Sequence, residues 1–223
     1  MGDHREQEIQ TAIKALKSNR FEPVEIVETA IEAGALVLSM IPPEAKVGMG
    51  GSTTLMQLGI FDDLLKKGQL TRSRPDIYLT GSNAITADGK LVNTDMTGNR
   101  VTNMIFGPKL VIVVAGINKV VADVPSALCR IKNVIAPAIA RNAGLKTPCS
   151  LEGKCTDCKS PFRVCTVTTI IEAKPRMTQI SIILVKEDLG LGWDPNWDEG
   201  RKERIFSVFK EKWAQLAATR EQR

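Results

Sequence analysis

The pattern with the clearest chemical potential is a glycine-rich loop that follows a short apolar segment and precedes three hydroxyl residues. Glycine lets backbone N–H groups approach a ligand closely, and a helix that begins at the hydroxyls would add its N-terminal donors. The loop has neither the ending of a P-loop nor the spacing of a dinucleotide site, so no nucleotide cofactor is expected. An ordinary strand-to-helix turn is the alternative to an anion site. Gly48, Gly50 and Gly51 would let backbone N–H groups approach the ligand, and Ser52, Thr53 or Thr54 would cap the helix and donate hydroxyls to a phosphate or carboxylate.

A second polar stretch spans 80–100 and contains an Asp-Gly pair between two apolar segments. Asp88-Gly89 with such flanks is typical of a tight β-hairpin. Small polar residues follow, among them Asp95, and the stretch ends at Asn99 and Arg100. Because an arginine can hold a carboxylate with two hydrogen bonds, we expect this stretch to line a pocket. Turn and cap residues are the alternative interpretation.

A near-continuous apolar run over 109–115 predicts a central strand that is buried on both faces of a parallel sheet. Asn118 and Lys119 follow this run, at the strand end where open α/β sheets bind ligands. We expect both to contact a ligand, and an exposed loop lysine is the alternative. The only histidine, His4, lies beside the N-terminus. A general base would therefore have to be a carboxylate, lysine, tyrosine or water.

Four cysteines fall within seventeen residues, inside a segment that also contains glycine and proline. This density indicates a metal-binding loop over 147–166. All-thiolate ligation suits structural Zn²⁺ or an iron–sulfur cluster, with [4Fe–4S] favoured, and the spacing does not decide between them. Cys129 stands apart and is expected to be a small buried apolar residue. The expected metal ligands are Cys149, Cys155, Cys158 and Cys165.

Length and composition favour one main domain, because 223 residues with 43% hydrophobic content support one substantial core. The formal net charge of +5 is interspersed, and ten aromatic residues provide little surface for stacking bases, so no nucleic-acid partner is expected. No apolar stretch approaches the ~20 residues of a membrane span, and the N-terminal residues lack a signal-peptide pattern. We expect a cytoplasmic protein with reduced cysteines.

The periodicity of apolar residues predicts an N-terminal helix in 1–20, a main domain over 21–190 and a C-terminal loop and helix over 191–223. The proline at position 137 is expected to break one helical stretch. The predicted helices are 5–18, 24–41, 55–67, 123–132, 137–142 and 199–219. The predicted strands are a short one before the glycine loop, 76–80, the two arms of the hairpin, 109–115, 164–172 and 178–186.

Three of these motifs, in this order, resemble the lactate-utilisation (LUD) domain family, which includes the LutC-type proteins. The motifs are Val47–Thr54, Ala84–Asp95 with Gly98-Asn99-Arg100, and Val114–Val121, and the resemblance covers roughly 20–190. It implies a three-layer α/β fold with a mostly parallel sheet, similar to ribose-5-phosphate isomerase, glucosamine-phosphate deaminase and coenzyme A transferases. In those relatives a glycine-rich loop holds an anion. Some short members of the family carry a similar cysteine loop.

The resemblance implies a role in using lactate or a related organic acid, beside iron–sulfur or redox partner proteins. The small anionic metabolite would be held by the glycine-rich loop with Arg100 and Lys119, and Asp88 or Asp95 would be the acid/base group. One alternative is an isomerase or hydrolase for a sugar phosphate or folate-like substrate. Another is a non-catalytic regulatory subunit with structural zinc. The sequence does not decide the oligomeric state, and a homo-oligomer is one of the open alternatives.

Overall fold

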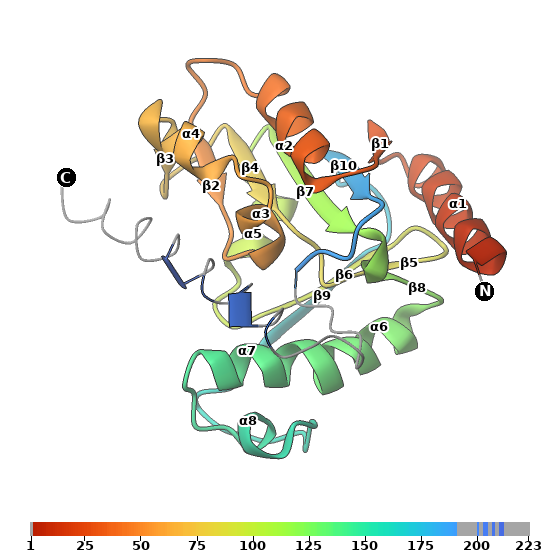
Figure 1. Cartoon of the computed structure of the whole chain (residues 1–223), viewed down its shortest axis with the longest axis vertical. Coiled ribbons are helices and arrows are strands. Elements are labelled where there is room, and N and C mark those ends of the chain that lie inside the picture. Colours follow the sequence, from red (N-terminus) through yellow and green to blue (C-terminus); the bar gives the residue numbers. More distant parts are fainter. Residues whose placement is uncertain (1, 191–199, 201–202, 205–206, 208–209, 212–223) are drawn as a thin grey trace.

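A six-stranded, fully parallel sheet forms the centre of the molecule in a computed structural model that describes residues 2–190, 200, 203–204, 207 and 210–211. The strand order is β1-β10-β7-β4-β2-β3 (Figure 1). The apolar run that predicted a central strand is β7, which pairs with β10 and β4. The strands are β1 (Val24–Val27), β2 (Val47–Met49), β3 (Leu70–Thr71), β4 (Ile77–Thr80), β7 (Leu110–Gly116) and β10 (Gln179–Val185).

Alternate residues of β7 are buried on opposite faces of this sheet, because successive strand side chains point to opposite sides. Ile112 and Val114 pack with α2 (Ala30–Ser39), α3 (Thr53–Met56) and α4 (Phe61–Lys66). Val111 and Val113 pack on the other face with α1 (Gly2–Ser18), α5 (Asn99–Ile105) and a second sheet. The predicted three-layer α/β class is confirmed.

The second sheet has four strands in the order β8-β5-β6-β9 and contains the predicted Asp-Gly hairpin. β5 and β6 pair antiparallel, and Gly89 takes the left-handed φ of +79° that the turn needs. A Cβ at Gly89 would lie 2.5 Å from the backbone of Ala15, so only glycine lets the hairpin pack against α1. The strands are β5 (Ala84–Thr86), β6 (Leu91–Asp95), β8 (Val120–Val121) and β9 (Val167–Ile171).

Two helix predictions were wrong in their extent. The segment 24–41 begins with β1, because Val24, Ile26 and Val27 suit a strand that pairs with β10, and the helix starts only after the Thr29 cap. The predicted helix 55–67 is divided into α3 and α4 at Gly59, whose φ is +72°. Each of the two helices is shorter than seven residues.

The predicted break at Pro137 was also wrong. α6 (Val124–Arg130) continues through a π-helical turn (Ile131–Ile135) into α7 (Ala136–Asn142), as one rod in Figure 1. Pro137 directly follows the π-helical turn, whose wider i→i−5 hydrogen bond from the Ala136 N–H to the Ile131 carbonyl lets the rod pass the proline without a break. The rod covers the outer face of the four-stranded sheet through Ala127 and Ile131.

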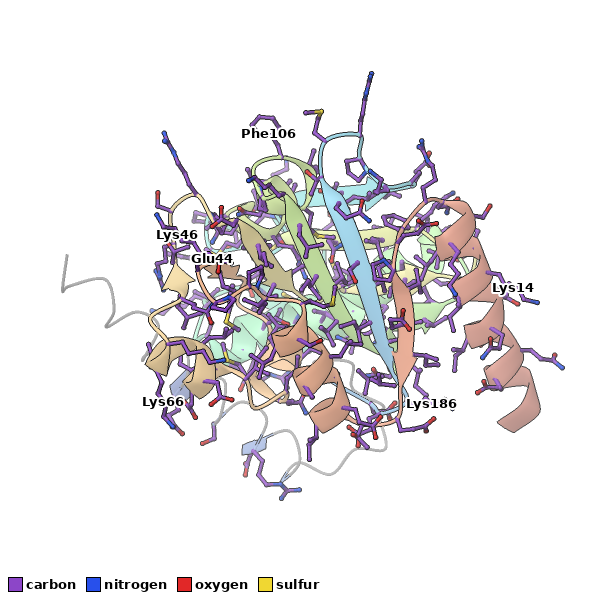
Figure 2. The ribbon with its side chains drawn as sticks, turned by 90° about the horizontal axis from the view of Figure 1, so that it is seen from above. Lys14, Glu44, Lys46, Lys66, Phe106 and Lys186 are labelled. Atoms are coloured by element: carbon purple, nitrogen blue, oxygen red, sulfur yellow. The ribbon has the colours of Figure 1, made fainter. Side chains whose placement is uncertain are left out.

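All six strands of the main sheet run in the same direction. The loops that follow the strands therefore lie at one end of the sheet, and the loops that precede them lie at the other end. Figure 2 shows Phe106, shortly before β7, at the opposite end of the sheet from Lys186, which directly follows β10. The strand predicted over 164–172 begins at Val167, and the predicted C-terminal segment 191–223 lies largely outside the described residues. Among the described helices, none is both long and apolar enough to cross a membrane.

Candidate functional site

Polar side chains are buried where β2, β4, β7 and β10 reach their carboxyl ends. Gly81, after β4, has Ser52 Oγ 2.9 Å from the position that a Cβ would occupy. Gly190, after β10, likewise leaves room for three polar atoms. A Cβ at this position would lie 2.4 Å from Thr54 Oγ1 and 3.2 Å from both Thr53 Oγ1 and Lys119 Nζ. We call Ser52, Thr53, Thr54 and Lys119 the carboxyl-end cluster. Four separate loops therefore supply or accommodate one group of hydroxyls and an amine.

Lys119 is the least expected member of this cluster, because its residue is only 4% exposed. Burial, together with the positive charges of Arg130 and Arg100, lowers the pKa of Lys119 to about 7. In the described part of the chain no carboxylate forms an ion pair with it. The exposed-loop alternative for this lysine is wrong, since the turn Ile117–Lys119 folds its side chain inward.

Asn118 holds the loop after β10 in place over this lysine. Its Oδ1 accepts from the Leu189 N–H at 3.2 Å, and its Nδ2 donates to the Leu189 carbonyl at 3.3 Å. The Gly190 N–H donates to Gln57 Oε1 at 2.6 Å. The role of Asn118 in this structure is thus to position Leu189 and Gly190 beside Lys119.

Arg100 is held rigidly at the start of α5. Its guanidinium pairs with Asp95 through Nε at 2.9 Å and through Nη2, and donates to Asn83 Oδ1 at 3.0 Å. The second oxygen of Asp95 accepts from the Val101 N–H at 2.9 Å. With side-chain exposures of 17% for Arg100 and 9% for Asp95, both groups are largely removed from water. Asp95 therefore already has a structural task, in capping α5 and orienting Arg100.

Tyr78 is a buried residue of this region that the sequence did not single out. Its residue is 4% exposed, and its hydroxyl has no hydrogen-bond partner among the described residues. Burial, augmented by Asp95 and opposed by Arg100, raises the pKa of Tyr78 to about 12. The hydroxyl stays protonated at neutral pH and is available as a donor. Because buried polar atoms in proteins are nearly always hydrogen-bonded, this hydroxyl is a candidate donor to a bound ligand.

Two glycines of the glycine-rich loop pack against this tyrosine. A Cβ on Gly48 would lie 2.9 Å from Pro75 and 3.0 Å from the Tyr78 ring, and one on Gly50 would lie 2.9 Å from the Tyr78 hydroxyl. Gly51 is exposed, and Ser52 caps α3 by accepting from the Leu55 N–H at 3.4 Å. Because α3 has only four residues, its dipole adds little to an anion site. The hydroxyls and cations, rather than a helix terminus, are the main polar groups here.

Two other predicted site residues lie at the surface. Asp88 occupies the hairpin turn with a side chain 57% exposed, bonded to Thr86 Oγ1 and paired with Lys90 at 3.0 Å. The Thr86 hydrogen bond is the main cause that lowers the pKa of Asp88. Asn99 begins α5 and is exposed.

The predicted cysteine ligands belong to a separate region beyond α7. Arg163 donates to the carbonyls of Cys158 and Cys165 at 3.0 Å, and to Cys165 Sγ at 3.5 Å. Cys149 is buried, with its Sγ 3.3 Å from Thr147 Oγ1, and Cys155 is partly exposed. In the described residues no group of three or more His, Cys, Asp or Glu side chains is arranged to hold a metal ion. Thiolate ligation stays a prediction.

Cys129 is exposed on α6, so the expectation that it is buried was wrong. Asn133, one helical turn further on, donates to Cys129 Sγ at 3.5 Å and accepts from the Cys155 N–H at 3.3 Å. The fifth cysteine therefore lies on the helix that carries the cysteine loop.

Sequence reasoning missed Tyr78, Arg130, Gly190 and the amides that fix Arg100. Asn93 Oδ1 accepts from the Asn83 N–H at 2.9 Å, and Asn83 Oδ1 in turn accepts from the Thr94 N–H at 2.8 Å. One signal was present: a single tyrosine, in an otherwise apolar strand, precedes the second polar stretch. The packing of Gly48 and Gly50 against it could not be read from either segment alone.

The structure is that of an α/β protein in which hydroxyls and a buried lysine gather at the carboxyl ends of the strands of a parallel sheet. The chain belongs to the LUD domain family, whose profile matches residues 73–185, just over half of its length. No curated protein matches the sequence. A crystal structure of a DUF162 family protein from Deinococcus radiodurans has the same fold, with a TM-score of 0.50 and 15% identity. That match covers 81% of this chain and 98% of the other. Membership of the family supports a role related to lactate utilisation.

Proposed function

We propose that the carboxyl-end cluster binds the carboxylate of a small organic acid, lactate or a related 2-hydroxy acid, for its utilisation. The observation that carries the proposal is Lys119, a buried amine that lies beside Gly190 with the Thr53 and Thr54 hydroxyls and has no carboxylate partner in the described residues. Burying a cation is costly unless an opposite charge compensates it. An anionic ligand provides that charge.

The surrounding groups suit a hydroxy acid rather than a bare anion. The hydroxyls of Ser52, Thr53 and Thr54 can donate to carboxylate oxygens or accept from a ligand hydroxyl. Tyr78 supplies a further buried donor near Gly50. The pair of Arg100 with Asp95 keeps one guanidinium at a fixed position from which it adds positive charge. Fixed donors of this kind favour binding because little is reorganised when the ligand arrives.

Titration calorimetry with lactate, oxalate and inorganic phosphate tests the proposal on the full chain. We expect lactate or oxalate to bind, and Lys119→Met to weaken binding at least about tenfold, the loss of one charge-assisted contact. Lys109→Met is the matched control, since this exposed lysine precedes the same strand that Lys119 follows. Absence of binding for all three anions, or equal affinities in the two variants, would contradict the proposal. Binding of phosphate alone would assign the cluster to a different ligand class.

We also propose that the cysteine loop binds Zn²⁺ or an iron–sulfur cluster and connects the protein to redox partners. Support comes from four cysteines within seventeen residues and from Arg163, which ties Cys158 to Cys165. Thiolates must replace their present hydrogen bonds when a metal enters, so the loop would rearrange on binding. Anaerobic purification with metal and sulfide analysis tests this, with Cys155→Ser as the loss variant and Cys129→Ser as the control. Equal metal content in all three proteins, including none, would contradict it.

A further inference from the structure

We infer that a cationic pocket at the amino ends of β4 and β7 binds the diphosphate group of a small ligand. The pocket has a volume of about 470 Å³ and lies between the segment that precedes β4 and the segment that joins α5 to β7. Cations from both segments line it, namely Arg72, Arg74 and Lys109. We call it the amino-end pocket. Because β4 and β7 are parallel, it lies at the opposite end of the sheet from the carboxyl-end cluster.

The charges of the amino-end pocket favour an anion with several negative charges. Arg74 and Lys109 are exposed, and neither forms an ion pair within the described part of the chain. The one carboxylate among the described lining residues is Asp76, whose Oδ2 accepts from the Lys46 N–H at 2.9 Å. A diphosphate carries about three negative charges at neutral pH, so it compensates three cations better than a single carboxylate does. Arginine holds phosphate oxygens with paired hydrogen bonds, and lysine adds a point charge.

Backbone contacts hold the two sides of the pocket in place. The Lys109 N–H donates to the Asp76 carbonyl at 3.0 Å, which fastens the start of β7 to the start of β4. A Cβ on Gly48 would lie 2.9 Å from Pro75, so the segment before β4 packs closely on β2. Arg74 has a left-handed φ of +46°, which is uncommon for a residue other than glycine and is found preferentially at functional sites. A pocket formed in advance binds its ligand at a lower entropic cost.

An apolar surface beside the cations can contact the rest of the ligand. Phe106 directly precedes Gly107, which lines the pocket, and it is 73% exposed, while Met177 is 77% exposed. The Thr178 hydroxyl donates to the Ile105 carbonyl at 3.0 Å, so the segment with Met177 lies beside the one with Phe106, at the end of the sheet that Figure 2 labels. Neighbouring exposed apolar groups often mark a binding surface. A base ring stacked on Phe106 would suit a nucleoside diphosphate.

Calorimetry of the full chain with pyrophosphate and with ADP, in buffer without divalent cations, tests the inference. We expect both to bind, and Arg74→Gln and Lys109→Met each to weaken binding at least about tenfold, the loss of one charge-assisted contact. Lys66→Met is the matched control, because it removes an exposed positive charge from α4, far from Phe106 in Figure 2. Thermal unfolding checks that the variants fold, as expected for substitutions of exposed side chains.

Phe106→Ala distinguishes the two sources of the diphosphate group. If the ligand is a nucleotide, this variant should weaken ADP binding at least about fivefold and leave pyrophosphate binding unchanged. If ADP and pyrophosphate bind alike in both proteins, the diphosphate group alone is recognised, which also supports the inference. The glycine-rich loop, whose spacing argued against a nucleotide, precedes α3 and does not line this pocket.

The outcomes also separate this inference from the proposed function. Lys109→Met should lose diphosphate affinity and retain lactate affinity, so it remains the control for the lactate site. Absence of binding for both probes, or equal weakening in Lys66→Met, overturns the inference and leaves the lactate site untouched. Pyrophosphate binding that is lost in Lys119→Met but retained in Arg74→Gln also overturns it, because the ligand then occupies the carboxyl-end cluster.

Discussion

The carboxyl-end cluster and the cysteine loop differ in how their residues come together. The cluster draws on segments as distant as 52–54 and 119, yet Thr53, Thr54 and Lys119 meet beside Gly190, and Ser52 lies with Thr54 beside Gly81. The loop has four cysteines within seventeen residues, yet no three of them form a ligand group in the described structure. Parallel strands bring their carboxyl ends together irrespective of sequence distance, whereas the ligands of a metal site are often brought together only when the metal binds.

The two regions also differ in burial, which decides how much each side chain affects stability. Lys119, Tyr78 and Asp95 are largely removed from water, so each charge or hydroxyl there has a large energetic effect. Cys155, Cys158 and Cys165 remain partly exposed, and their hydrogen bonds can be exchanged for water. Substitutions should therefore separate the two regions clearly.

The largest effect is expected from Lys119→Met, and it should depend on pH. The folded-state pKa of Lys119, about 7, lies below its usual value of 10.5. Between these values the unfolded chain binds more protons, so this lysine makes the wild type more stable as the pH rises. Lys119→Met should be the more stable protein near pH 7, and its advantage should shrink by up to about 1.4 kcal/mol per pH unit, in total about 3 kcal/mol by pH 10. Urea unfolding of both proteins across this range measures the difference. A constant difference would mean that the buried amine is compensated within the protein.

Asp95→Ala is expected to lower the unfolding free energy by about 3 kcal/mol. The substitution leaves the largely buried charge of Arg100 without its carboxylate partner, and it removes the acceptor of the Val101 N–H at the start of α5. Asp88→Ala is the control. Its carboxylate is 57% exposed and should contribute no more than about 1 kcal/mol. Denaturant unfolding compares the two. Equal losses would show that the Asp95 pair is no more important than a surface pair.

Tyr78→Phe should change stability little, by about 1 kcal/mol or less, because its hydroxyl has no partner to lose among the described residues. Anion affinity should fall about fivefold if that hydroxyl donates to the ligand. Unfolding and calorimetry on the same preparations measure both quantities. A clearly destabilised variant with unchanged affinity would instead identify Tyr78 as the partner of a structural water.

The smallest effect is expected in the cysteine loop. In reduced, metal-free protein, Cys155→Ser should alter the unfolding free energy by no more than about 0.5 kcal/mol, since the thiol is partly exposed. After loading with metal, the wild type should gain stability that Cys155→Ser lacks, because a ligand of the folded state stabilises it. Thermal unfolding before and after chelation measures this gain. A large effect without metal would show that the loop is already ordered by its own contacts.

Sequence patterns predicted the parts of the fold that depend on local chemistry. The Asp88-Gly89 hairpin, the buried strand β7 and the amphipathic α1 all follow from turn propensity and periodicity. Val24–Val27 was mistaken for a helix because its pairing with β10 lies far along the chain. The continuous passage through Pro137 depends on a π-helical turn, which no residue pattern there signals.

The candidate site was predictable only in outline. Lys119 was identified because it follows the apolar run 109–115, and Arg100 because it ends the polar stretch 80–100. The burial of Lys119 could not be predicted, because it depends on the loops that carry Thr53 and Gly190. Gly48 and Gly50 were interpreted as ligand contacts, and in the structure they also make room for Tyr78. A glycine does not reveal in sequence which neighbour requires the space that it leaves.

The measurement that tests the central claim most directly is the number of protons taken up when the anion binds. Calorimetry of lactate binding in two buffers with different ionisation enthalpies gives this number. At about pH 8 most of the Lys119 amine is uncharged in the free protein, and an anion beside it should restore the charge by raising its pKa. We predict an uptake approaching about one proton per lactate, absent in Lys119→Met and retained in Lys109→Met. Lactate binding without proton uptake would show that Lys119 is not the partner of the anion.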